Sequence, residues 1–238
     1  MNEIIHKNET RGLADHGWLL SRHTFSFADY YNPERERFGL LRVVNDDIVK
    51  PSMGFGTHPH ENMEIVSIPL TGSLRHQDSM GNRHVITAGE VQIMSAGSGL
   101  THSEYNNSDN DDVNFLQIWV FPKEKNIPPR YGQRYFDRVD RQNRFQVVVS
   151  PQASDETIWI NQDAWFSMAD LDAGKRARYE KHLRDNGVYF FVIEGKVKIN
   201  GQSIERRDGL GSAVGESFLV RSETDAQLLV IEVPMSGR

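Results

Sequence analysis

Two short motifs hold the side chains of this 238-residue chain whose type and spacing could do chemistry. Segment 58–60 reads His-Pro-His, and segment 102–104 repeats the spacing as His-Ser-Glu. Residues i and i+2 of a strand point to the same face of a sheet. If the two motifs lie on neighbouring strands, their four nitrogen and oxygen ligands converge on one point. The spacing therefore predicts a metal site made by His58, His60, His102 and Glu104.

The composition restricts the chemistry of such a site. The chain has no cysteine, which excludes thiolate ligands, iron–sulfur clusters and disulfides, so the metal must use histidine and carboxylate. Three imidazoles and one carboxylate suit a single divalent ion, Fe(II) first, with Mn, Co, Ni, Cu or Zn as alternatives. An octahedral ion would keep two positions for a chelating enol and O2. We expect the metal to lower the pKa of the enol hydroxyl, and Glu104 to take the proton while loosening from the metal.

The charge and hydropathy patterns disfavour several classes of partner. The formal net charge is -6, and lysine and arginine are scattered rather than gathered in a stripe that would follow a phosphate backbone. No apolar window of about 18 residues could span a bilayer. The chain also begins without the basic start and apolar stretch of a secretory signal. We therefore expect a cytoplasmic protein that binds small molecules, with no direct binding of nucleic acid or membrane, and the sequence leaves any protein partner unknown.

The elements that would position the site are expected to be strands. Most apolar runs are short and bounded by turn residues, and few have helical spacing. In 196–200, which reads Lys-Val-Lys-Ile-Asn, the apolar residues fall on one face, as in a sheet with one solvated side. The expected strands are 40–44, 64–69, 91–95, 113–120, 145–149, 188–193, 196–200, 217–221 and 228–233.

The two halves of the chain contain a faint repeat, which indicates duplication. In the first half, Leu-Thr-Gly-Ser-Leu at 70–74 leads through a turn to Ala-Gly-Glu-Val-Gln-Ile at 88–93. In the second, Ile-Glu-Gly-Lys-Val at 193–197 leads through a turn to Asp-Gly-Leu-Gly at 208–211. Two small antiparallel barrels, each a double-sheet jelly roll, explain the repeat.

The repeat also predicts how the barrels divide the chain and which of them binds metal. A polar segment ending in two prolines precedes residue 130, so we expect an N-terminal barrel at 1–125, a linker at 126–139 and a C-terminal barrel at 140–238. The positions that align with the four ligands are Lys181, Leu183, Ser222 and Thr224. None of these binds such a metal readily, so the C-terminal barrel is expected to lack one.

The residues around the two motifs resemble the pirin family. Segments 54–64 and 89–106 are similar to the first and second cupin motifs, although Ser95 stands where the second motif usually has proline. His-Gln-Asp-Ser-Met-Gly-Asn at 76–82 and Gln-Ile-Met-Ser-Ala-Gly at 92–97 are similar to pirins in particular. The resemblance covers nearly the whole chain, with the second half matching in outline.

This resemblance implies a fold, a cofactor and an activity. Pirins are mainly β bicupins, with two double-stranded β-helix (jelly-roll) barrels and one metal, usually iron, in the N-terminal cupin. Bacterial pirins are regarded as quercetin 2,3-dioxygenases, which implies that this chain opens a flavonol with O2, releasing carbon monoxide and a depside. The alternative that the resemblance implies is a metal-responsive, non-enzymatic regulatory binding protein, as animal pirins are described.

Two assignments stay open in the sequence. Many cupins take their carboxylate ligand from the first motif, which nominates Glu64, whereas the His-x-Glu of pirins nominates Glu104. Parity does not decide, because Glu64 lies an even number of residues from His58 and His60. We favour Glu104 on the family pattern. For His76, a position on a solvent-facing hairpin is at least as expected as one beside the metal.

Overall fold

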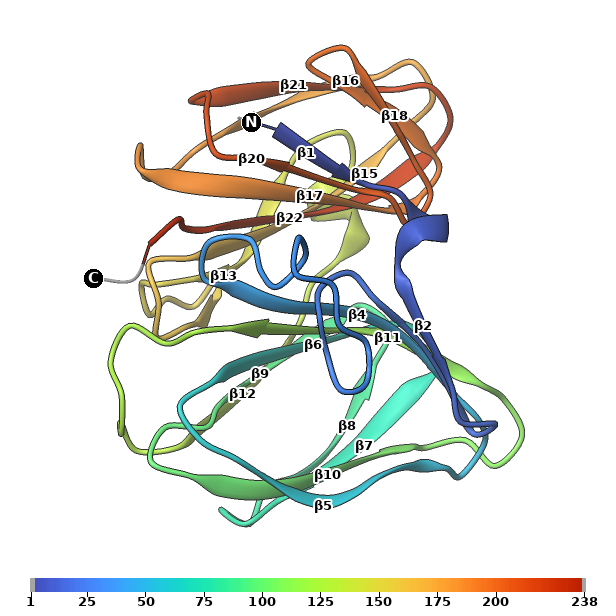
Figure 1. Cartoon of the computed structure of the whole chain (residues 1–238), viewed down its shortest axis with the longest axis vertical. Helices are drawn as coiled ribbons and strands as arrows, with labels where there is room; N and C mark the ends of the chain where they lie inside the picture. Colours follow the sequence, from blue (N-terminus) through green and yellow to red (C-terminus); the bar gives the residue numbers. More distant parts are fainter. Residues whose placement is uncertain (1–2, 237–238) are drawn as a thin grey trace.

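In the computed structural model, which describes residues 3–236, the strands form four sheets stacked as layers (Figure 1). Two seven-stranded sheets face each other in the middle, and a four-stranded sheet closes each outer side. Each half of the chain thus builds one barrel from a larger and a smaller sheet. The expected bicupin architecture is confirmed. No helix among the described residues has the length and apolar character needed to cross a membrane.

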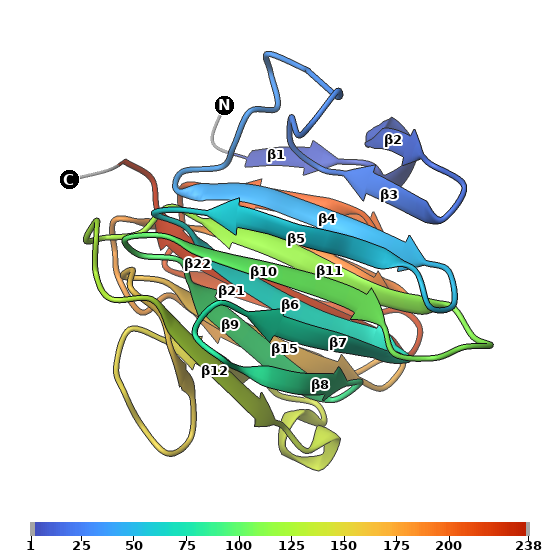
Figure 2. The same ribbon diagram turned by 90° about the horizontal axis from the view of Figure 1, so that it is seen from below.

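The first barrel has the sheet orders β12-β9-β6-β11-β4-β3-β2 and β5-β10-β7-β8. Figure 2 views it from below, with β5 and β10 lying side by side across the four-stranded sheet. Its strands are β2 (Gly12–Asp15), β3 (Leu19–His23), β4 (Leu41–Val49), β5 (Gly54–His60), β6 (Glu64–Thr71), β7 (Ser73–Asp78), β8 (Arg83–Thr87), β9 (Glu90–Ser95), β10 (Leu100–Asn106), β11 (Val113–Val120) and β12 (Arg130–Tyr135).

The second barrel repeats this plan with the orders β1-β20-β17-β22-β15-β13-β14 and β16-β21-β18-β19. Its strands are β1 (Glu3–His6), β13 (Gln146–Ser150), β14 (Ile158–Trp159), β15 (Trp165–Leu171), β16 (Arg176–Glu180), β17 (Asn186–Glu194), β18 (Lys196–Ile199), β19 (Gln202–Glu205), β20 (Gly209–Ser212), β21 (Ser217–Ser222) and β22 (Ala226–Pro234). Two short 3-10 turns, η1 (Asn8–Thr10) and η2 (Arg138–Arg141), complete the described elements.

All nine expected strands are present, and the largest difference concerns where one of them ends. The strand expected at 40–44 continues to Val49 as β4, through the polar run Asn45, Asp46 and Asp47. These three side chains are buried. They are satisfied by partners from other strands: His23 contacts Asn45, and the Ser21 hydroxyl donates to Asp47. A hydrophobic pattern cannot reveal a strand whose buried positions are polar.

The expected boundaries between the two halves need two corrections. The segment predicted as a linker contains β12, which pairs with β9 as the edge strand of the first barrel. The segment predicted to open the first barrel contains β1, which instead pairs with β20 of the second barrel. Lys7, directly after β1, bonds Asp208 at 2.7 Å. The N-terminal segment therefore joins the two barrels before the chain enters the first one.

The two barrels have different interiors, which is decisive for where a metal can bind. Between them lies a shared apolar layer that includes Leu116, Ile118, Phe191 and Ile231. The interior of the second barrel is filled by apolar side chains, among them Val188, Phe190, Val192, Phe218 and Val220. Within residues 3–236, the first barrel has two small apolar clusters of its own, and it also contains buried polar residues such as Ser67, His102 and Glu104. The second barrel also buries polar groups, among them Ser167 and Glu232, which accepts a hydrogen bond from Tyr179, but its apolar cluster is much larger than those of the first barrel.

The strand that presents the His-x-His motif lies very close to its neighbour. At Gly54, the first residue of β5, an added Cβ atom would clash with the carbonyl oxygen of Glu104 and lie 2.5 Å from the Cα of Tyr105. At Gly56, two residues along, it would meet only the Tyr105 hydroxyl at 3.7 Å, an ordinary contact. Only glycine at position 54 permits this approach of β5 to β10.

We expect Gly54→Ala to lower the free energy of unfolding by about 1–3 kcal/mol, because backbone atoms of β10 would have to move. Gly56→Ala is the matched control on the same strand, with an expected change within about 0.5 kcal/mol. Urea unfolding in EDTA measures both. Equal stability of the two variants would contradict the close approach at Gly54.

Candidate metal centre

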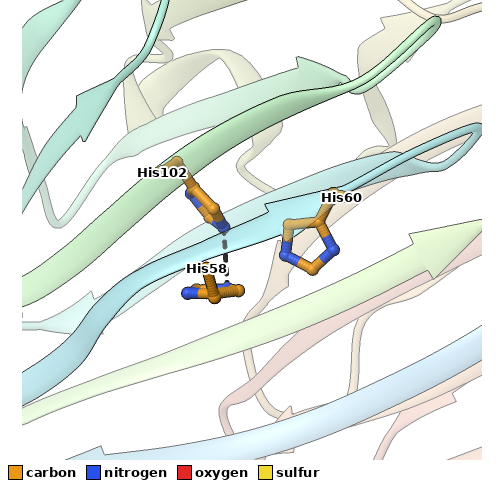
Figure 3. Close-up of side chains that lie close together, drawn as sticks. All are labelled: His58, His60 and His102. Atoms are coloured by element: carbon orange, nitrogen blue, oxygen red, sulfur yellow. Dashed lines mark hydrogen bonds between the residues drawn. The ribbon is translucent and has the colours of Figure 1, made fainter.

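Three imidazoles converge inside the first barrel (Figure 3). β5 and β10 pair antiparallel, and their register sets His58 opposite His102 and His60 opposite Leu100. The ring centroids lie 4.5 Å apart for His58 and His102, 4.8 Å for His58 and His60, and 4.9 Å for His60 and His102. The Nε2 atoms of His58 and His102 are 3.0 Å apart. One nitrogen from each ring lies within 4.8 Å of the others, which is the spread that a single ion can bridge.

The fourth predicted residue, Glu104, lies on β10 next to a β-bulge. The register with β5 shifts between His102 and Glu104, so that Glu104 lies opposite Phe55. The side chain is buried, and its oxygens accept hydrogen bonds from Ser67 Oγ at 3.1 Å and Gln117 Nε2 at 2.8 Å.

A ligand atom of Glu104 forms a second compact group with His102 and His76, again within 4.8 Å of one another. The four predicted residues are thus distributed over two groups, and His102 belongs to both.

Glu64, the alternative carboxylate, has other partners. It accepts a hydrogen bond from Ser95 Oγ at 2.7 Å and one from the backbone N–H of Asn161, in the second half of the chain, at 3.1 Å. Neither compact group among residues 3–236 includes Glu64. Ser95, which replaces the usual cupin proline, therefore serves to hold Glu64. This geometry favours Glu104 as the ligand.

The expectation that His76 lies on a solvent-facing hairpin is wrong. Its side chain is 0% exposed and packs against Tyr131 in a tilted arrangement, with ring centroids 4.9 Å apart. The sequence contained a signal for this position. Leu74, His76 and Asp78 alternate along β7 and are all buried, whereas Arg75 and Gln77 between them are exposed. An apolar residue at i-2 therefore indicated that the histidine faces inward.

Burial sets the protonation of these groups. Burial, aided by the neighbouring histidines, lowers the pKa of His60 to about 4 and that of His102 to about 2, so both rings are neutral at neutral pH. Burial also raises the pKa of Glu104 to about 7, although the hydrogen bonds from Ser67 and Gln117 oppose this. Neutral imidazoles present lone pairs to a cation, and a carboxylate that is costly to ionise alone gains most from a nearby positive charge.

An aromatic wall and an open groove adjoin the imidazoles. Trp119 packs edge-on against His60, with centroids 5.0 Å apart, and its indole N–H donates to Gln117, which in turn holds Glu104. His60 also lines a groove of about 580 Å³, together with Pro59, Glu61, Ser79, Ser98, Gly99, Leu100 and Thr101. The groove gives a small molecule a way to approach the imidazoles.

Comparison with known proteins gives consistent matches along the chain. A family model described as Pirin matches residues 6–120, and one described as the quercetinase C-terminal cupin domain matches residues 147–233. An Escherichia coli K12 protein named quercetin 2,3-dioxygenase is 42% identical over 234 residues, covering 97% of this chain and 98% of its own. A pirin-like protein of Caulobacter vibrioides is 38% identical over 222 residues, covering 93% and 95%.

Solved structures match equally well. The crystal structure of YhhW from Escherichia coli superposes with a TM-score of 0.94 at 41% identity, covering 99% of both chains. A second structure, of bacterial pirin YhhW in complex with nickel(II), gives a TM-score of 0.92 at 40% identity and covers 98% of this chain and 99% of its own.

The raised pKa of Glu104 has a consequence for stability in the absence of metal. Between pH 4.5, the ordinary value, and about 7, the folded chain keeps Glu104 protonated while the unfolded chain releases the proton. Stability therefore falls as pH rises through this window, by roughly 3 kcal/mol for this one group at 1.36 kcal/mol per pKa unit. In EDTA, we expect the free energy of unfolding of Glu104→Gln, relative to that of the wild type, to rise by roughly 3 kcal/mol between pH 5 and pH 8.

Urea unfolding at several pH values measures the difference. The control is Glu61→Gln, which changes an exposed carboxyl on the groove. Its free energy of unfolding relative to the wild type should not rise with pH. If the difference in free energy of unfolding between Glu104→Gln and the wild type does not change with pH, the claim that Glu104 is buried and protonated is contradicted.

Proposed function

The chain belongs to the pirin family, and from this we propose that it is a metal-dependent dioxygenase that opens flavonols such as quercetin with O2. The observation that supports this most is the convergence of His58, His60 and His102, with Glu104 beside them, in the barrel whose interior is polar. The open groove next to His60 supplies the approach that an aromatic substrate needs. The Escherichia coli relative bears the name of this activity.

The residues present fit a divalent transition metal. Three imidazoles and one carboxylate match the donors that Fe(II), Co, Ni and Zn accept. The buried Nδ1 of His102 and Nδ1 of His76 have no hydrogen-bond partner, as expected where polar atoms await a ligand or an oriented water. We propose His58, His60, His102 and Glu104 as the ligands, and Fe(II) as the metal; the nickel(II) complex of the relative YhhW is consistent with a site that accepts several ions. When bound, the metal would acidify an enol hydroxyl of the flavonol and bind the anion.

Glu104 is positioned to receive the proton that the flavonol releases. Its two oxygens have different partners: the Ser67 hydroxyl at Oε1 and the Gln117 amide at Oε2. An amide N–H can only donate, whereas a hydroxyl can rotate to accept. The arriving proton is therefore accommodated at Oε1, with Ser67 turning from donor to acceptor. Gln117 keeps Oε2 in place, and Trp119 holds the Gln117 amide in that orientation.

The apolar neighbours in this part of the first barrel are Trp119, which packs edge-on against His60, and the fully buried Phe115 and Met94. A flat aromatic substrate entering by the groove would therefore meet the imidazoles at their exposed side, because His58 and His60 are only partly buried while His102 and Glu104 lie deep.

Oxygen uptake with quercetin tests the proposal. The chain is purified anaerobically, its metal is quantified, and it is reconstituted separately with Fe(II), Mn, Co, Ni, Cu and Zn. We expect one O2 consumed and one carbon monoxide released per flavonol with at least one metal. His58→Ala and Glu104→Gln should lower kcat/KM by at least about 100-fold, because each removes a proposed ligand. His16→Ala, an exposed histidine of the first barrel, should leave it unchanged.

The alternative of a regulatory binding protein makes the opposite forecast. Absence of quercetin turnover with every metal, together with retained metal binding, would contradict the dioxygenase and favour the metal-responsive protein. Turnover that continues without oxygen would point instead to an isomerase or a decarboxylase.

A further inference from the structure

A buried histidine outside the proposed ligand set lies directly against that set. His76 is on β7, where it pairs with Glu104 of β10, and its side chain is 0% exposed. Its ring centroid is 5.4 Å from that of His102. One ring nitrogen of His76, one of His102 and one carboxylate oxygen of Glu104 all lie within 4.8 Å of one another. The burial of this group is complete, in contrast to the partly exposed His58 and His60.

Asp78 determines which nitrogen of His76 is free. His76 Nε2 lies 3.3 Å from Asp78 Oδ2. The Asp78 carboxylate also accepts hydrogen bonds from the backbone N–H groups of Met80 and Asn82 and from the Asn82 side chain, at 2.8–3.0 Å. Both oxygens of Asp78 thus accept from two groups each, Oδ1 from the backbone N–H groups and Oδ2 from the Asn82 amide and the His76 ring. In this arrangement Asp78 is the acceptor and His76 Nε2 the donor.

The other nitrogen, Nδ1, then has a free lone pair in a buried environment. No described side chain or backbone group donates to it. Tyr131, which packs against the ring, does not donate to Nδ1, since its hydroxyl donates to Gln133 at 2.7 Å. Burying a polar atom without a partner is unfavourable, so such atoms usually indicate a missing ligand, ion or water.

The same arrangement occurs at a proposed ligand. A histidine that binds metal through one nitrogen almost always donates its other N–H to a carboxylate or a backbone carbonyl, which fixes the tautomer. His58 does this through Nδ1, which lies 2.8 Å from the carbonyl oxygen of Gly56. His76 does it through Nε2 and Asp78. Both rings are thus held with one lone pair directed away from the group that orients them.

We propose that His76, His102 and Glu104 form a second, deeper position for a divalent cation, beneath the outer position at His58 and His60. This rests on the proposed function only in that both require a metal in the first barrel. The two groups share His102, and Glu104, the one carboxylate in them, is also the proposed fourth ligand of the outer position. Two divalent ions so close together would repel each other strongly, so one ion occupies either position at a time.

Titration of the EDTA-treated full-length chain with Co²⁺ tests this, because the ligand-field absorption of Co²⁺ reports on its ligands. His58→Ala leaves the deeper group intact. We expect this variant to bind one Co²⁺ more weakly than the wild type and with a changed visible spectrum. Adding His76→Gln should then weaken Co²⁺ binding by at least about 100-fold, more than the 10–100-fold that loss of an orienting partner causes.

The controls separate ligation from folding. His76→Gln keeps an N–H for Asp78 while removing Nδ1, and thermal unfolding in EDTA should show that the double variant folds like His58→Ala. His84→Ala is the matched control in the same background, since exposed His84 lies opposite His76 on β8 and belongs to neither group. Failure of His58→Ala to bind Co²⁺, or a loss below 100-fold on adding His76→Gln, would overturn the proposal. Quercetin turnover is measured in a separate assay. The deeper Co²⁺ position can therefore fail its test while the dioxygenase proposal holds, and the reverse.

Discussion

The antiparallel pairing of β5 with β10 is the constraint on which the candidate site depends. It sets His58 opposite His102, so that two imidazoles from distant parts of the sequence share one side of a sheet. Gly54 lets the strands approach at one end, and the bulge after His102 moves the register so that Glu104 does not lie opposite a residue of the His-x-His motif. A one-residue slip in this pairing would turn the imidazoles to the opposite face of the sheet.

The rest of the first barrel stabilises that pairing without filling the space around it. Ser67 and Gln117 hold Glu104 from the opposite sheet, and Asp78 holds His76 from its own strand. In the second barrel the equivalent interior is mostly apolar, and alternate residues of β17 belong to two clusters, with Phe190 inside the barrel and Phe191 between the barrels. One barrel thus has a mostly apolar interior, and the other has buried polar side chains that suit a metal.

Much of the fold was predictable because strand alternation and turns are local properties. The apolar runs marked nine strands, and the i, i+2 spacing placed His58, His60 and His102 on converging faces. What local patterns missed depends on partners distant in sequence. The polar run 45–47 is buried because other strands satisfy it, and β12 became a strand because the edge of β9 was free to pair with it. The choice between Glu64 and Glu104 needed the positions of Ser95, Asn161, Ser67 and Gln117, which no spacing reveals.

The central claim is that one transition metal binds inside the first barrel on His58, His60, His102 and Glu104. Anomalous X-ray diffraction from crystals of the wild-type chain loaded anaerobically with Fe(II) measures this most directly. We expect one strong peak within bonding distance of His102 and Glu104, with the His58 and His60 nitrogens completing the ligand set. A peak bonded to Glu64, a peak in the second barrel, or no peak in the first barrel would contradict the claim.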